Sequence, residues 1–581
     1  MKFAFKPIAI AAALAFIGTA AVASPMKPGT YTAKVNGHNA PLTVEVTVDA
    51  NKILSIKTPD DQESLGVGKV GLKKTADNIL RYQSIGVDAV TGATFSSNAL
   101  KEGVEKCLKQ AGADMKQFTR KAEKHPIHNR TYQADVVVIG GGGAGLASAI
   151  SSMQAGAKKV IVLEKLGYVG GSTNVSEGAL NAVDDQRQKA QGIKDSYETF
   201  YETTMHGGHD KGDPTLVRFL TSHSMDAVNW LESLGVKFND HIGAATGSLG
   251  QRSHYPATPY GNTYIRTFEK VIADSNGKIQ VLLDTPAVKL IQNKSGRVVG
   301  VVGNNFGSKV TVMAKDGVII ATGGFGANVA YRQKVNTGVW KNIKLDNSIG
   351  CTNIQKAAQG QGLFLAQKVG AKLIGLSDIQ IHPCGTPGTG LMENIRTSGR
   401  NRIFVNSDGN RFVNEGAARD VLANAIFQQK GRTYWIVVNK LRYPTPDFKD
   451  RMGASIRNME ALGAVVEAPT LDELAKKTGM NAENLKKAIA DYNAVVSGKA
   501  KDKLGFVANN KDDKQMTEGP WYACRKVPTV HHTMGGIRIN PKSQALDKNG
   551  KVIPGLYAAG EVTGVTHGTN RLGGNAYADI L

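Results

Sequence analysis

The strongest constraint on the fold is a glycine-rich turn that follows a short apolar strand. Residues 135–139 form that strand, and the glycines behind it, Gly140, Gly142 and Gly145, have the spacing G-x-G-x-x-G. Residues 146–154 then have a helical pattern, 160–163 form a second apolar strand, and Glu164 follows it. This order is typical of a βαβ unit that binds a dinucleotide, with its phosphates at the helix N-terminus and its ribose on the acid.

The N-terminus predicts export. A chain of 581 residues is too long for one hydrophobic core, so we expect about two to four domains. Lys2 and Lys6 precede the apolar run 8–17, and Ala21-Val22-Ala23 has the small-x-small form of a cleavage site. We therefore expect residues 1–23 to be a Sec-type signal peptide and the mature protein to be periplasmic.

Composition excludes several other classes of protein. The net charge is +22, but the basic residues are spread along the chain and form no nucleic-acid-binding module, so we expect no nucleic acid as a partner. The four cysteines have no spacing of a disulfide framework or a metal site, so no metal is expected. No Cys-x-x-Cys-His occurs in the sequence, so this chain attaches no c-type haem.

Residues 24–116 form a first unit with its own motif. Tyr31–Val35 and Leu42–Val48 alternate like half-buried strands, and Ser96 or Ser97 can cap a helix that runs to about residue 108. The loop between them, Asp-Ala-Val-Thr-Gly-Ala-Thr at 88–94, resembles the motif that receives FMN covalently in bacterial FMN-binding domains. The resemblance implies an α+β domain with FMN on Thr94, attached by a flavin transferase, followed by a linker at 117–132.

Three later segments resemble the FAD contacts of the fumarate reductase and succinate dehydrogenase flavoprotein family. The residues that carry this resemblance are Gly171, Ser172, Thr173, Thr322, Gly323, Gly324 and Glu561. It implies non-covalent FAD in a doubly wound, Rossmann-like α/β domain at 133–371 and 528–581. An α+β clamp domain at 372–527 is inserted into it. With the FMN unit, the architecture resembles soluble, flavocytochrome c-type fumarate or urocanate reductases.

The same resemblance implies an active site. Arg419 matches the proton donor, and Glu393 and Arg396 match the proton path that leads to it. His531 and Arg571 match the pair that grips one substrate carboxylate, and His382 matches the group near the far end of the substrate. Fixed cations around a carboxylate stabilise the charge that develops when a conjugated C=C bond accepts a hydride.

The expected function is reduction of the C=C bond of an α,β-unsaturated carboxylate by an exported two-flavin enzyme. Electrons would come from a periplasmic or membrane-anchored cytochrome. Met392 stands where fumarate-specific members have Thr, so fumarate, urocanate, methacrylate and other enoates remain open as substrates. An electron-transfer flavoprotein without substrate chemistry and a dehydrogenase working in reverse are the alternatives. Relatives continue through a final helix past Leu581, which predicts a short last helix or a truncated chain.

Overall fold

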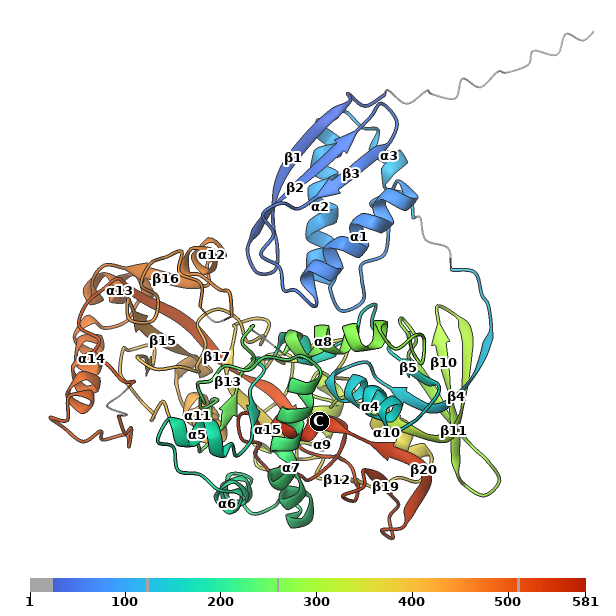
Figure 1. The fold of residues 1–581 in the computed structure, drawn as a ribbon. Helices are drawn as coiled ribbons and strands as arrows, with labels where there is room; N and C mark the ends of the chain where they lie inside the picture. The colour runs from blue at the N-terminus through green and yellow to red at the C-terminus, as the bar shows by residue number, and fades with distance from the viewer. Residues whose placement is uncertain (1–24, 122–124, 259–260, 451, 509–511) are drawn as a thin grey trace, which may run out of the picture.

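The computed structural model describes residues 25–121, 125–258, 261–450, 452–508 and 512–581. It has three parts: an N-terminal domain, a central domain with the largest sheet, and an outer domain, which we call the clamp and which is inserted into the central one (Figure 1). The predicted signal peptide at 1–23 lies outside the described residues. Within them, no helix is long and apolar enough to cross a membrane, and no cluster of His, Cys, Asp or Glu suits a metal ion.

The N-terminal domain is a three-stranded antiparallel sheet with helices packed against it (Figure 1). Every second residue of the middle strand is buried, as the alternating pattern predicts. The elements are β1 (Gly29–Asn36), β2 (Pro41–Val48), β3 (Ile53–Lys57), α1 (Gly68–Tyr82), α2 (Thr94–Gln110) and α3 (Met115–Phe118).

Helix α2 begins earlier than the sequence predicts. Its first residue is Thr94, its N-cap is Ala93, and neither Ser96 nor Ser97 caps it. Both hydroxyls have partners elsewhere: Ser96 Oγ donates to Glu63 Oε2 at 2.7 Å, and Ser97 Oγ accepts from the backbone N of Val90 at 3.2 Å. Because these hydroxyls are used in tertiary contacts, the cap prediction is wrong.

The central domain is built on an eight-stranded sheet with the order β19-β20-β11-β4-β5-β8, in which β10 pairs with both β11 and β9. The inner pairs from β20 to β8 are parallel, and β5 is buried along its whole length, as expected of a sheet covered on both faces. The strands are β4 (Arg130–Ile139), β5 (Val160–Leu163), β8 (Ile279–Leu282), β9 (Ala287–Gln292), β10 (Val298–Asn305), β11 (Ser308–Ile320), β19 (Gln544–Leu546) and β20 (Val552–Ala558).

Strand β4 starts inside the segment predicted as a linker. Arg130 pairs with Val310 of β11, and the parallel pairing continues to Ile139. The long β11 thus extends the strand backwards by five residues beyond the apolar run that the sequence marks. This pairing joins segments about 180 residues apart, so local sequence carries no sign of it.

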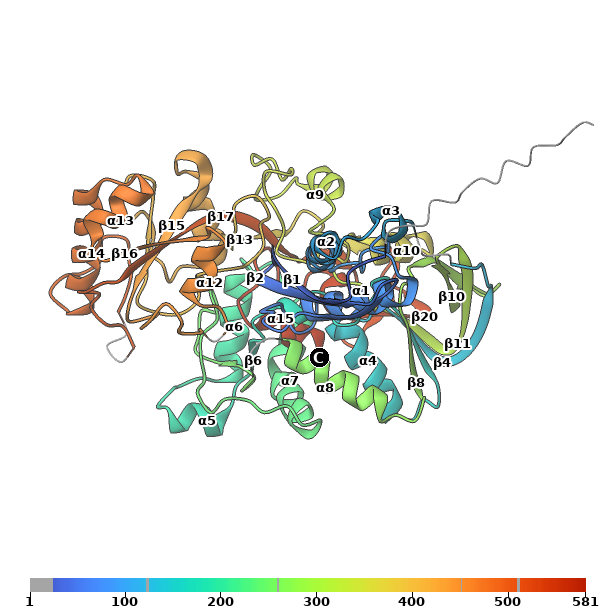
Figure 2. The same cartoon turned by 90° about the horizontal axis from the view of Figure 1, so that it is seen from above.

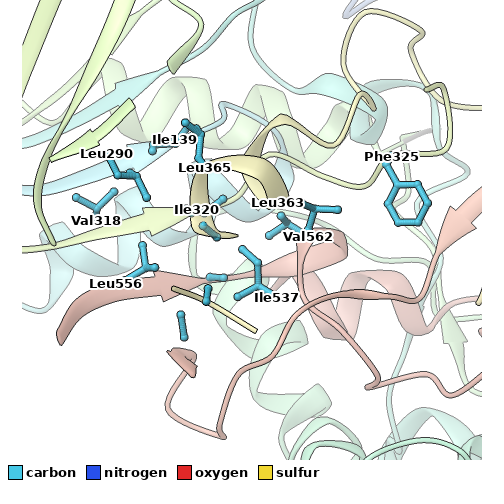
Figure 3. Packing of buried hydrophobic residues seen from close by; sticks show 14 of the residues in the cluster. Ile139, Leu290, Val318, Ile320, Phe325, Leu363, Leu365, Ile537, Leu556 and Val562 are labelled. Carbon is cyan, nitrogen blue, oxygen red and sulfur yellow. The ribbon is translucent and has the colours of Figure 1, made fainter. Parts of the chain in front are cut away.

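Helices cover the central sheet on both sides. Figure 3 shows the core on one face, where Ile139, Val318, Ile320 and Leu556 from the sheet meet Leu363 and Leu365 from a helix. The helices of the whole central domain are α4 (Gly143–Gln154), α5 (Asp185–Ala190), α6 (Tyr197–Gly207), α7 (Pro214–Ser233), α8 (Asn262–Ala273), α9 (Val329–Val335), α10 (Gln361–Lys368) and α15 (Asn575–Ile580). Small paired strands and 3-10 helices complete the domain: β6 (Leu180–Asn181), β7 (Ser253–His254), β12 (Leu373–Ile374), β18 (Gly536–Ile537), η1 (Gly171–Val175) and η3 (Gly560–Val562).

The clamp has a five-stranded antiparallel sheet of order β13-β17-β15-β14, with β16 also paired to β17. Its longest strand, β17, runs from the clamp into the middle of the molecule (Figures 1 and 2). The elements are β13 (Ile379–Gly385), β14 (Ile403–Val405), α11 (Arg419–Phe427), η2 (Lys430–Arg432), β15 (Tyr434–Asn439), α12 (Ile456–Ala461), β16 (Val465–Ala468), α13 (Leu471–Thr478), α14 (Ala482–Val496) and β17 (Trp521–Thr533).

Candidate active site

The glycine turn between β4 and α4 has the geometry that a phosphate site needs. Gly140 has a φ of +108°, which disfavours residues with a Cβ. A Cβ on Gly145 would lie 1.8 Å from the carbonyl O of Gly140, so this glycine lets the helix pack against the turn. A Cβ on Gly142 would meet nothing within 4 Å, because that side of the turn faces a large cavity.

The cavity has about 1250 Å³ of empty space, part of it open to solvent. It fits a dinucleotide cofactor, because two polar atoms in its wall, Thr322 Oγ1 and Asn353 Nδ2, are buried without a hydrogen-bond partner among the described residues. The structure brings nearly all predicted cofactor residues to its wall: Gly140, Gly142, Glu164, Gly171, Ser172, Thr173, Thr322, Gly323, Gly324 and Glu561.

Two carboxylates of this wall, the buried Glu164 and the half-buried Glu561, have backbone partners. Glu164 accepts from the backbone N of Gly141 at 2.6 Å and of Leu166 at 2.7 Å, so it holds the glycine turn in place. Burial raises the pKa of Glu164. Glu561 accepts from Thr533 N at 3.0 Å, and burial raises its pKa to about 7. A ribose contact of Glu164 stays a prediction.

Arg571 and His531 also line this cavity. Arg571 donates to the carbonyl O of Leu572 at 3.1 Å, while its Nε is buried without a partner within the described chain. Burial lowers the pKa of Arg571 to about 10, so it remains a cation at neutral pH. Thr352 Oγ1 lies 2.7 Å from Nδ1 of His531 and fixes that ring. An anion with two oxygens, such as a carboxylate, could accept hydrogen bonds from the remaining donor atoms of Arg571 and His531.

Arg419, the first residue of α11, is held beside this pair. Its Nε donates to Thr246 O and its Nη1 donates to Gln380 Oε1, both at 2.9 Å. Gln380 in turn donates to the carbonyl O of Arg571 at 2.6 Å, so one amide fixes both arginines. Burial lowers the pKa of Arg419 well below its ordinary value, and the charge of Arg571 adds to the effect.

His382 lies on β13 against His531, with the two ring centroids 4.8 Å apart. Its Nδ1 accepts from the backbone N of Cys384 at 3.1 Å, which leaves the ring proton on Nε2. That Nε2 is buried, with no partner in the described part of the chain. Burial and then the charges of Arg419 and Arg571 lower the pKa of His382 well below its usual range. The ring is therefore a neutral donor at neutral pH.

The two predicted residues of the proton path have separate partners. Oε1 of Glu393 lies 3.0 Å from Nε2 of His38, which belongs to the N-terminal domain. Nη1 of Arg396 lies 3.6 Å from Oε1 of Glu177, and Glu177 is also the acid whose charge raises the pKa of Arg419. The structure thus places a second carboxylate, which the sequence did not single out, in contact with Arg396 and close enough to Arg419 for its charge to act there.

The N-terminal domain packs against the mouth of the cavity, and Figure 2 shows it above the centre of the molecule. Val90 and Ala93 form an apolar cluster with Leu166 and Tyr168, and Leu166 also lines the cavity. Tyr168 Oη donates to the carbonyl O of Gly92 at 3.2 Å. Thr94, two residues after Gly92, is exposed. The predicted FMN attachment residue therefore lies at the border between the two domains.

Comparison with known proteins agrees with this geometry. Residues 135–577 match the family described as FAD binding domain, and residues 37–109 match the family described as FMN-binding domain. The chain belongs to the FAD-binding oxidoreductase family. Its predicted fold class, its two cofactors and its assignment to the oxidoreductases are thereby confirmed.

Several relatives of this flavoprotein have names that state a reaction. It is 34% identical to the NADH:acrylate oxidoreductase of Vibrio harveyi over 95% of its own length, but spans 60% of that protein. It is 34% identical to the urocanate reductase of Eggerthella lenta, with 95% and 90% of the two chains covered. A solved open conformation of a flavocytochrome c3 fumarate reductase matches with a TM-score of 0.61, 34% identity, and 77% and 76% of the chains covered.

Proposed function

We propose that this flavoprotein reduces the C=C bond of an α,β-unsaturated carboxylate. One observation carries the proposal: Arg571 and His531 line the FAD cavity, and a second buried guanidinium, Arg419, and a second neutral histidine, His382, lie next to this pair. A protein that only shuttles electrons has no need of such a cluster. The names of the relatives, which include acrylate, urocanate and fumarate reductases, support the same chemistry.

Arg571 and His531 would bind the carboxylate next to the reacting bond. Arg571 offers its guanidinium edge, and burial strengthens the attraction by excluding water. Burial, and then the neighbouring charges, lower the pKa of His531, so this histidine acts as a neutral donor. Both groups stabilise the negative charge that develops on the carboxylate in the transition state.

FAD, when bound, supplies the hydride for the β-carbon of the substrate. Arg419 would give the proton to the α-carbon. Its lowered pKa suits this role, because burial makes the charged guanidinium a better proton donor than an exposed one. Glu393 and Arg396 would return the proton, and Glu177 contacts Arg396 and acts on Arg419 through its charge.

FMN on Thr94 would pass electrons to FAD. The exposed Thr94 at the start of α2 leaves room for the flavin, and the helix N-terminus favours its phosphate. We further propose that a flavin transferase attaches the FMN, that FAD is non-covalent, and that a cytochrome outside the cytoplasm donates the electrons. The signal-peptide pattern at 1–23 supports a periplasmic location.

The distal part of the substrate decides which acid is used. His382 offers one buried donor there, and the neighbouring loop carries Met392 instead of a hydroxyl residue. Fumarate, urocanate and smaller enoates such as acrylate differ in this part alone.

The test is anaerobic reoxidation of the viologen-reduced holoprotein by fumarate, urocanate, methacrylate, acrylate and cinnamate. Rapid reoxidation by one acid, with the saturated acid as product, is the expected result. Flavins that stay reduced with every acid would contradict the proposal and favour the alternative, an electron-transfer flavoprotein without substrate chemistry.

A further inference from the structure

A histidine of the FMN-binding domain contacts the acid at the outer end of the proposed proton path. His38 lies in the turn between β1 and β2, and its Nε2 is 3.0 Å from Oε1 of Glu393. The two side chains are 29% and 26% exposed, so the pair stands at the rim of the interface between the domains.

Both ring nitrogens of His38 face an oxygen. Nδ1 lies 2.9 Å from Oδ1 of Asn39, while Nε2 faces Glu393. A ring with an acceptor on each side is best satisfied as the imidazolium, which donates from both nitrogens. Burial lowers the pKa of His38, but the hydrogen bond and the charge of Glu393, with Asn39 and Glu63 adding to them, raise it to about 9.

The turn that carries His38 is tied to the helix that carries Thr94. Glu63, 4% exposed, accepts from the backbone N of His38 at 2.6 Å and from Ser96 Oγ at 2.7 Å. Ser96 lies two residues after Thr94 in the first turn of α2. His38 is therefore held in a fixed position relative to the FMN attachment residue.

The other side of the contact is equally fixed. The ammonium group of Lys526, a fully buried residue of β17, donates to the carbonyl O of Glu393. The charged groups that face His38 are Glu393 from the clamp and Glu63 from its own domain. Hydrogen bonds within each domain thus fix the two residues of the pair: Glu63 binds the backbone of His38, and Lys526 binds the backbone of Glu393.

We propose that His38 hands a proton to Glu393 whenever the FMN-binding domain is docked. The Nε2–H bond breaks, an O–H bond forms on Glu393, and the neutral ring keeps its proton toward Asn39. Once Glu393 has passed this proton on toward Arg396, Nε2 accepts a new proton from a hydronium ion of the solvent at the rim, which leaves a water molecule. No electron moves in this step. The proposal rests on the proposed function. His38 would not touch the substrate, so it is a positioning residue that acts through Glu393. Electron delivery and proton supply would share one interface.

The first test is the pH dependence of turnover with the best acid of the panel. Wild-type turnover should fall as the pH rises through about 9, because His38 loses its proton there. His38→Gln keeps a donor but cannot titrate, so it should turn over about tenfold more slowly at neutral pH. It should also lack the alkaline fall and show a larger solvent deuterium isotope effect.

The matched control is Lys449→Ala. It removes another contact between the same two domains, in which Lys449 Nζ donates to Gln62 Oε1 at 3.1 Å, and should leave turnover and pH profile unchanged. A His38→Gln enzyme with wild-type turnover and the wild-type alkaline fall would overturn the proposal.

The second test needs no substrate. In the holoprotein, the His38 ring followed by NMR should titrate near 9, and in Glu393→Gln it should titrate clearly lower. A wild-type titration near 6.5, the ordinary value, would overturn the ion pair itself. If no acid reoxidises the flavins, the proposed function fails, while this titration still decides whether the pair exists.

Discussion

Arg419 has the surroundings of a group that must be rigid and ready to release a proton. Its two hydrogen bonds, to Thr246 and to Gln380, fix the guanidinium plane from both sides. Because the side chain is 6% exposed, water cannot replace these contacts. The penalty of a buried charge is then relieved only when the proton leaves or an anionic substrate arrives.

Replacing Arg419 by Ala should lower turnover by about 10³-fold or more while both flavins stay bound. Turnover should fall because Arg419 is the proposed proton donor. FAD should still bind, because Arg419 is not among the residues that line the FAD cavity. Turnover and flavin spectra measure the two effects. Arg218→Ala, which removes an exposed arginine paired with Glu198, is the control and should be unchanged. Wild-type turnover in the Arg419 variant would disprove its role.

Glu177→Gln, made in the His38→Gln enzyme that lacks the alkaline fall of His38, should lower turnover about tenfold further and bring an alkaline limb that belongs to Arg419 into the measured pH range. The charge of Glu177 raises the pKa of Arg419, so its removal lets Arg419 lose its proton at a lower pH. Ser398→Ala removes only a hydroxyl that donates to Glu177 at 3.1 Å and should shift the profile little. An unshifted profile in the double variant would rule out the acid's effect on Arg419.

At the scale of single elements, two glycines of the turn between β4 and α4 should serve different purposes, one in folding and one in cofactor binding. Gly145→Ala places a Cβ 1.8 Å from a backbone oxygen, which should cost roughly 3 kcal/mol or more. Gly142→Ala points a methyl group into the open cavity, so it should fold normally and lose FAD. Thermal unfolding and FAD content distinguish the pair; full FAD content in Gly142→Ala would mean that the cofactor lies elsewhere.

In helix α2, FMN attachment can likewise be tested apart from folding. Thr94→Ala should abolish covalent FMN and leave FAD and folding intact, because the residue is exposed. Denaturing gels that retain flavin fluorescence report the covalent bond. An acid-stable flavin on the Thr94→Ala protein would contradict the attachment site.

Local patterns predict elements well and their partners poorly. The alternation in β2 and the glycine spacing after β4 define these elements because the signals lie within about ten residues. The partner of Glu393 is His38, 355 positions away, and no local pattern records such a contact. For the same reason, the sequence missed Gln380 as the link between the arginines and Glu177 as a site acid.

At the scale of the whole molecule, docking of the FMN-binding domain should weaken at alkaline pH. The pKa of His38 is raised to about 9 by its partner, so the contribution of the ion pair is complete below pH 6.5 and is lost as the pH rises through about 9. Proteolysis within the linker, followed from pH 7 to 10, should accelerate over this range. His38→Gln should remove the pH dependence; a wild-type protein cleaved equally fast at both ends of the range would contradict the docking role.

The measurement that tests the proposed two-flavin reduction most directly is an electron count in a single turnover. The fully reduced holoprotein, with two electrons on each flavin, is mixed anaerobically with the acid that the panel identifies, and the saturated product is counted. We expect two molecules of product per wild-type chain and one per Thr94→Ala chain, because FMN refills FAD. Two molecules from the Thr94→Ala protein, or none from the wild type, would contradict it.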